Sequence, residues 1–160
     1  MNYTYDPEQV ARIITYYNPS AYAMITGGIN HPDIYGETNF YNIQNGVLVV
    51  TMLENLPRNP QGFYGFHLHN GDSCTGNAQD NFANAGTHYN PEGKTHPSHA
   101  GDFPPIISRN GSAFLAFVTD SFTIPEIIGK TVIIHSMPDD FSTDPAGNSG
   151  EKIACGVIRV

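Results

Sequence analysis

The sequence has few basic residues. Lys and Arg total 7 of 160 residues against 15 Asp and Glu, which gives a formal net charge of -8 at pH 7. The chain also has no cluster of Lys or Arg. Because nucleic acids and acidic membrane surfaces are bound through concentrated positive charge, this balance argues against either as a partner.

Long apolar runs are missing as well. The longest, such as 47–50 and 133–134, are far shorter than the roughly 20 residues that cross a bilayer, so we expect no membrane span. The first residues have neither a basic region nor an apolar region of the kind that starts an export signal. We therefore expect that such a signal is absent or already removed, and the compartment stays open.

Cysteine is scarce too. Cys74 and Cys155 are the only two, so one disulfide at most can form, and two thiols are compatible with either redox environment. Gly contributes 16 residues, Pro 12, and charged residues only 14%, a mixture that favours turns over long helices. At this length, the composition predicts a single all-β domain.

The N-terminal region differs from the rest. Asp6 can cap a helix with Pro7 in its first position, and apolar residues follow at helical spacing until Pro19. We expect an extension with a short helix over residues 1–19 and a β domain over 20–160.

Short strand-like runs fill that β domain. They are found at 20–26, 39–43, 47–52, 62–69, 113–119, 130–135 and 153–160. Asn45-Gly46 is a strong hairpin signal between two of them. The stretches 70–108 and 136–151 lack strand character, and loops of that length are usually functional or disordered. This pattern predicts seven or eight strands in an antiparallel sandwich or flattened barrel.

Histidine is the informative residue type, with five of the seven lying between positions 67 and 99. His67 and His69 lie in a strand-like run, where alternate side chains share a face and stand roughly 7 Å apart. One metal ion could bind both. Taken alone, the pair could equally be two solvent-facing histidines.

Four further donors follow in a loop that is poor in apolar residues. They are His88, His96, His99 and Asp102, the nitrogen and oxygen ligands that Zn²⁺ binds tetrahedrally. A polar turn with incidental histidines is the alternative. Because this loop cannot order itself by burial, we favour a metal that holds it together.

His135 ends a strand-like run and is followed by Asp139 and Asp140. A histidine at such a place is more often structural, but metal-bound histidines commonly donate their second ring N–H to a carboxylate. The nearby acids therefore favour His135 as a metal ligand. His31 lies in a turn with no other histidine nearby, and we assign it no role.

These residues together resemble the copper/zinc superoxide dismutase family. The matching blocks are GFHLH at 65–69, GDSC at 71–74, GTHYNP at 86–91, HAGD at 99–102, IIGK at 127–130, VIIH at 132–135 and GNSGEKIACGVI at 147–158. The similarity covers about residues 21–160 and implies a Greek-key β-barrel or sandwich of eight strands, to which the short N-terminal helix is added.

The resemblance also implies the metal ligands. Copper would be bound by His67, His69, His88 and His135, and zinc by His88, His96, His99 and Asp102. His88 would be shared as an imidazolate, which two divalent ions stabilise. Asp139 matches the acid that links a copper histidine to a zinc histidine, here His67 and His96. Cys74 and Cys155 match the family's disulfide, which would stabilise the fold by roughly 4 to 5 kcal/mol at most.

By the same resemblance the chain converts superoxide to O₂ and H₂O₂ through alternate reduction and reoxidation of copper, with His88 as bridge and proton source. Lys152 stands where the family has an arginine beside copper, and it lacks the planar guanidinium. We therefore expect catalysis roughly tenfold slower than usual.

The alternative is a non-enzymatic member that binds copper and zinc. A zinc hydrolase is disfavoured because three histidines and an aspartate fill zinc's four positions. A homodimer stays open.

Overall fold

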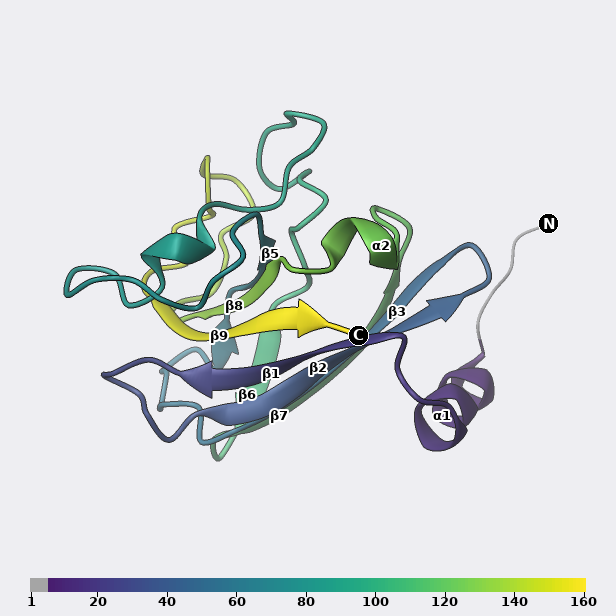
Figure 1. Cartoon of the computed structure of the whole chain (residues 1–160). Helices are drawn as coiled ribbons and strands as arrows, with labels where there is room; N and C mark the ends of the chain where they lie inside the picture. The colour runs from purple at the N-terminus through teal and green to yellow at the C-terminus, as the bar shows by residue number, and fades with distance from the viewer. Residues whose placement is uncertain (1–5) are drawn as a thin grey trace.

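The computed structural model of the chain describes residues 6–160, and nearly all strands in this part form one antiparallel barrel (Figure 1). The strands are β1 (Ala21–Gly27), β2 (Tyr35–Ile43), β3 (Gly46–Glu54), β4 (Phe63–Tyr64), β5 (Phe66–His69), β6 (Ile106–Arg109), β7 (Ser112–Thr119), β8 (Thr131–His135) and β9 (Lys152–Arg159). Their order in the sheet is β4-β6-β7-β3-β2-β1-β9-β8-β5. The two end strands, β4 and β5, are separated in the chain only by Gly65, so the barrel is nearly closed.

The barrel interior is filled by alternate side chains of the strands. In β1, Ala21, Ala23 and Ile25 are buried while Tyr22 and Met24 are exposed, as the period of two in a half-buried strand requires. The predicted hairpin is present between β2 and β3. The predicted all-β barrel fold is therefore confirmed.

The described residues form nine strands, against the seven or eight expected and the seven runs found in the sequence, for two reasons. The run expected at 62–69 is split at Gly65, where an added Cβ would lie 2.8 Å from the Cβ of Ser149, because loop 136–151 passes against the chain there. β6 begins inside the stretch 70–108, which was expected to have no strand. It has only four residues directly after Pro104 and Pro105, and so offers no alternating run to detect.

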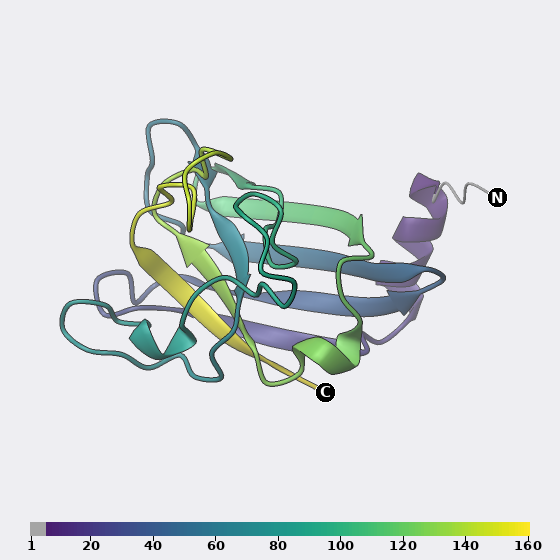
Figure 2. The ribbon, with the colours of Figure 1, turned by 90° about the horizontal axis from the view of Figure 1, so that it is seen from above.

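The N-terminal helix α1 (Pro7–Tyr16) packs on the outside of the sheet. It begins where the sequence predicts, since the Asp6 side chain accepts a hydrogen bond from the Gln9 backbone N–H at 2.8 Å. Its apolar face covers outward-facing side chains of β2 and β3, with Val10, Ile13 and Ile14 packed on Tyr41, Leu48 and Val50. Figures 1 and 2 place α1 at one end of the barrel and the long loops at the other.

Two other short helices are present, η1 (Ala83–Ala85) and α2 (Ile124–Ile127). In the part of the chain that the structure describes, none of the helices has the length and hydropathy needed to span a membrane. The division into an extension at 1–19 and a domain at 20–160 stays a prediction.

Candidate metal centre

Strand β5 supplies the first two histidines and fixes their direction. Phe66 and Leu68 point into the barrel core, and His67 and His69 point to the other face. The centroids of the two imidazole rings are 6.4 Å apart, close to the distance expected for alternate residues of a strand. Both histidines are buried, because long loops cover this face of β5.

The free edge of β5 is occupied by the backbone of loop 86–103. The Leu68 N–H donates to the Gly101 carbonyl at 2.9 Å, and the Tyr89 N–H donates to the Leu68 carbonyl at 2.7 Å. Gly101 is required at this close approach, since a Cβ there would lie 2.3 Å from the Leu68 carbonyl oxygen. Backbone bridges on this edge pair His69 with His88 and His67 with Asp102.

His135 reaches the same place from the neighbouring strand. β8 pairs with β5 in the register that sets His67 opposite Ile133, and a register shift follows between Ile134 and His135. As a result, one nitrogen from each of four buried histidines lies within 4.8 Å of the other three. We call this group the strand cluster. Its members are His67, His69, His88 and His135.

Hydrogen bonds in the strand cluster leave one nitrogen of each ring turned to the centre. His69 Nδ1 donates to the Gly86 carbonyl at 2.9 Å, and His135 Nδ1 to the Gly150 carbonyl at 3.2 Å. The remaining Nε2 atoms of these two rings are 3.4 Å apart. His67 Nδ1 and His88 Nε2 are buried without a hydrogen-bond partner. Two of these four buried nitrogens have no partner and the other two face only each other, a donor set that fits a copper ion.

A second group, the loop cluster, shares His88. Its members are His88, His96, His99 and Asp102, whose donor atoms also lie within 4.8 Å of one another. Asp102 is at its centre, with Oδ1 2.7 Å from His88 Nδ1 and Oδ2 3.2 Å from the Nδ1 atoms of His96 and His99. Three imidazoles and one carboxylate are a donor set that fits tetrahedral Zn²⁺.

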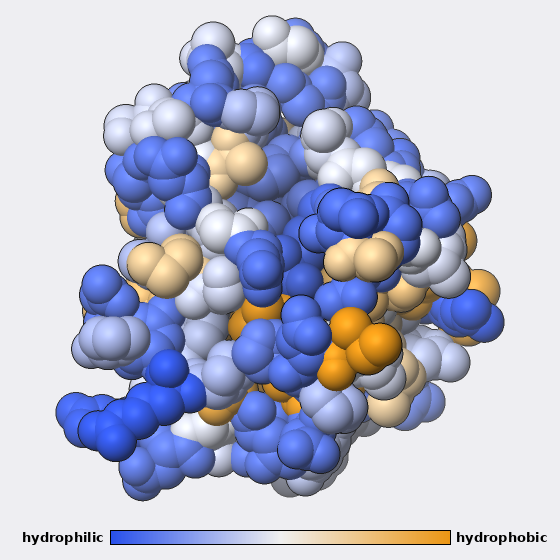
Figure 3. Space-filling model, turned by 90° about the vertical axis from the view of Figure 1, so that its left-hand side faces the viewer, coloured by the Kyte–Doolittle hydropathy of each residue, from blue (hydrophilic) through white to orange (hydrophobic). Residues whose placement is uncertain are grey.

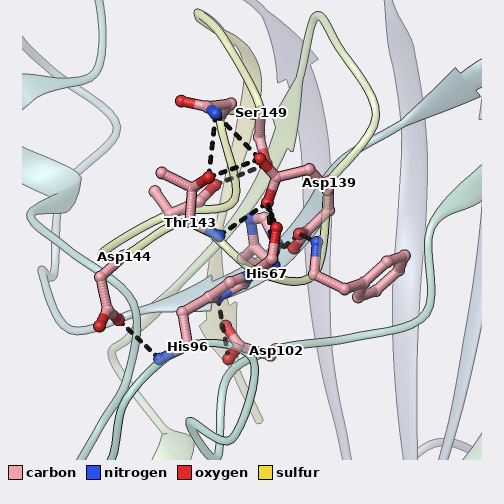
Figure 4. A network of polar contacts seen from close by, with 12 residues as sticks. His67, His96, Asp102, Asp139, Thr143, Asp144 and Ser149 are labelled. Carbon is pink, nitrogen blue, oxygen red and sulfur yellow. Dashed lines mark hydrogen bonds and ion pairs between the residues drawn. The ribbon is translucent and has the colours of Figure 1, made fainter.

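Asp139 lies between the two clusters, at the place the resemblance assigns to it (Figure 4). Its Oδ2 accepts from His67 Nε2 at 2.7 Å and its Oδ1 from His96 Nε2 at 2.8 Å. Burial alone would raise the pKa of Asp139, but hydrogen bonds from His67 and from the Phe141 backbone outweigh it and lower the pKa to about 2. Gly147 leaves room for this link, because a Cβ there would lie 2.0 Å from Asp139 Oδ1.

Asp144 also acts on His96 and was not predicted from the sequence. Its Oδ1 accepts from the His96 backbone N–H at 2.7 Å, as Figure 4 shows. The loop that carries it is shaped by Asp140, which accepts hydrogen bonds from Ser142 and Thr143. An Asp followed by Ser and Thr is a local turn signal, but it does not indicate which distant backbone the next acid will reach.

Burial keeps His69 and His135 of the strand cluster neutral. The pKa of His69 lies well below its usual value, first because of burial and then because of His135. The pKa of His135 is lowered to about 3, first by burial and then by His67. Neutral imidazoles have the free lone pairs that a metal requires, so His69 and His135 can bind a metal without losing protons near neutral pH.

A cavity of about 660 Å³ opens onto the strand cluster. His69, His88 and His135 line it, together with Lys152, which the sequence predicts here. Asp80 lines it as well and was not predicted. Asp80 lies in the long loop 70–86. Nothing in the sequence indicates that it contacts Lys152, which is 72 positions further along the chain. The face formed by these loops is largely hydrophilic (Figure 3). His31 belongs to neither cluster.

The predicted disulfide between Cys74 and Cys155 is present, with a sequence separation of 81. It joins loop 70–86 to β9, the strand that also carries Lys152. Two segments that line the cavity are therefore covalently tied to each other.

Comparison with known proteins gives one consistent result. The family model for copper/zinc superoxide dismutase (SODC) matches residues 34–158. Superoxide dismutase [Cu-Zn] 2 of Aquifex aeolicus is 33% identical over 142 residues, 79% of this chain and 80% of the relative. Superoxide dismutase [Cu-Zn] of Legionella pneumophila is 32% identical over 136 residues, 80% of each chain. The structure of Cu/Zn superoxide dismutase from Brucella abortus superposes with a TM-score of 0.74 at 25% identity, covering 88% of this chain and 100% of that chain.

Proposed function

The chain belongs to the copper/zinc superoxide dismutase family, and from this we propose that it converts two superoxide ions and two protons into O₂ and H₂O₂. One observation carries the proposal. Both donor clusters are complete and buried, and they share His88. The unused nitrogens of the strand cluster face its centre, where they have no other partner in the described structure.

We assign the strand cluster to copper and the loop cluster to zinc. Copper supplies the one-electron oxidation of one superoxide and the one-electron reduction of the next, while zinc, which has no accessible redox state, supplies charge and fixed geometry. The protein holds the first set mainly with strands and the second with Asp139 and Asp144.

His88 is the proposed bridge and proton carrier. Its Nδ1 faces Asp102 in the loop cluster, and its Nε2 faces the strand cluster with no hydrogen-bond partner. When Nε2 is not engaged as a ligand it can hold a proton, and the cavity that His88 lines lets that proton pass to the reduced substrate.

Lys152 is the proposed anion-binding residue. A protein of net charge -8 attracts superoxide only through a local positive field, and the Lys152 ammonium lies in the cavity wall. An ammonium keeps the charge of arginine but lacks its planar pair of donors. We therefore propose that turnover is roughly tenfold slower than with arginine, and that Lys152→Arg raises the second-order rate constant.

The test is to load the protein with copper and zinc, measure both metals, and follow superoxide decay after rapid mixing. We expect superoxide decay that depends on bound copper. His135→Ala should abolish both copper binding and this activity. His31→Ala is the matched control, because His31 lies outside both clusters, and it should keep full activity.

The alternative function is copper and zinc binding without catalysis. It would be supported by full metal content with superoxide decay no faster than in protein-free solution. The homodimer stays a prediction.

A further inference from the structure

We propose that Asp80 is a positioning residue that holds the Lys152 ammonium and thereby limits how strongly small anions are drawn into the cavity. The proposal rests on the proposed function, because it concerns the approach of the anionic substrate. It assigns a role to a residue that belongs to neither metal cluster.

The contact between the two side chains is direct. Lys152 Nζ donates to Asp80 Oδ2 at 2.6 Å, and its second contact is the Phe82 carbonyl oxygen at 3.4 Å. The Lys152 side chain is 15% exposed and that of Asp80 is 38% exposed. Both residues line the cavity that opens onto His69, His88 and His135. The pair therefore forms part of the wall of the cavity through which the substrate would approach.

Because few charged side chains line the cavity, this pair largely sets how strongly the cavity attracts an anion. Among the residues that the structure describes, its lining contains two carboxylates, Asp80 and Glu151, and a single permanent cation, Lys152. A carboxylate in contact with an ammonium cancels most of its field a few ångströms away, and the effect is larger where the surroundings are partly buried. An approaching monoanion thus meets a weakened attraction. Removing the Asp80 charge would leave the ammonium free to interact with it.

Asp80 is fixed from its own side as well, unlike a mobile carboxylate on an open surface. Its Oδ1 accepts from the Phe82 backbone N–H at 2.9 Å, and its carbonyl accepts from Asn77 at 2.9 Å. Burial alone would raise the pKa of Asp80, but the hydrogen bond from Lys152 outweighs it, so the carboxylate stays ionised near neutral pH. The disulfide ties this loop to β9, the strand of Lys152.

The main experiment compares Asp80→Asn with the parent protein, both loaded with copper and zinc. We expect the second-order rate constant for superoxide at low ionic strength to rise roughly threefold to tenfold, the lower part of the range of electrostatic steering. The dissociation constant for azide, a small monoanion read from the copper absorption band, should fall by a similar factor. Asp80→Glu keeps the charge and should stay near the parent.

Two further variants separate the proposed route from a general charge effect. Asp72→Asn removes the same charge from an exposed position of the same loop that does not line the cavity, and should change the rate little. In a Lys152→Met background, Asp80→Asn should lose most of its effect, because the two residues act as one unit. Equal gains from Asp72→Asn and Asp80→Asn, an undiminished gain without Lys152, or a rate that falls in Asp80→Asn would each overturn the proposal.

A readout without metals tests the same contact. The chain has only three lysines, Lys94, Lys130 and Lys152, so labelling of the metal-free protein with trinitrobenzenesulfonate, an anionic amine reagent, can be mapped by mass spectrometry. Asp80→Asn should speed labelling of Lys152 severalfold and leave the other two lysines unchanged. If the loaded parent consumes no superoxide, the proposed function fails, while labelling and azide binding still decide whether Asp80 controls Lys152.

Discussion

The two halves of the metal centre are built by different parts of the molecule. In the strand cluster, His67, His69 and His135 belong to β5 and β8, whose backbones are paired with each other. In the loop cluster every donor lies in the irregular segment 86–103. The sheet fixes the first set through its ladder, whereas the second set depends on Asp139 and Asp144, which reach across from loop 136–151. The strand cluster is thus ordered by the fold and the loop cluster by polar contacts.

The largest expected effect is a loss of stability at acidic pH. The neutral, buried His135 has a pKa of about 3 in the folded protein against an ordinary 6.5, so between these values the unfolded chain binds more protons. Its contribution to stability is complete above about pH 6.5 and is lost as the pH falls toward 3. For His135 alone this amounts to about 2 kcal/mol between pH 7 and pH 5, and His69 acts in the same direction.

Urea unfolding of the metal-free protein across that range measures the effect. His135→Asn should flatten the pH dependence. A free energy of unfolding that does not change between pH 7 and pH 5 would show that His69 and His135 are not held neutral by the fold.

The next effect separates the two halves directly. Asp139→Ala removes one contact from His67 and one from His96. His67 keeps its place in the β5 ladder, while His96 has no strand to hold it. We expect zinc affinity to fall roughly tenfold to hundredfold and copper affinity to fall less. Chelator competition for each metal checks this, with Asp33→Ala, outside both clusters, as the control. Equal losses of affinity for copper and zinc would contradict the view that the sheet holds the strand cluster while polar contacts hold the loop cluster.

The smallest effect is expected at Asp144. Asp144→Ala removes the acceptor for a single backbone N–H of His96, which is worth about 1 kcal/mol, or roughly fivefold in zinc affinity. Asp144→Asn keeps an acceptor oxygen and should lose less. Copper affinity should not change in either variant. A loss of copper in Asp144→Ala would mean that loop 136–151 supports the strand cluster too.

Prediction from the sequence succeeded where the signal was local. The alternation of Phe66 to His69 placed two imidazoles on one face, and the Asp6-Pro7 start of α1 was correct. It failed where the contact was remote. β6 is too short to show a pattern, and the partners of Asp80 and Asp144 lie 72 and 48 positions away. Such pairings are decided by how two irregular loops come together, and periodicity carries no information about that.

By itself the sequence predicted the fold class, because strand and turn patterns act through local backbone geometry. Its resemblance to a metalloprotein family implied the order of the candidate histidine ligands along the chain. Only the tertiary structure decided that β5 receives loop 86–103 on its free edge, that Asp144 holds the backbone of His96, and that the Lys152 ammonium is paired with Asp80. Those contacts depend on distances between segments that become neighbours only once the barrel has closed.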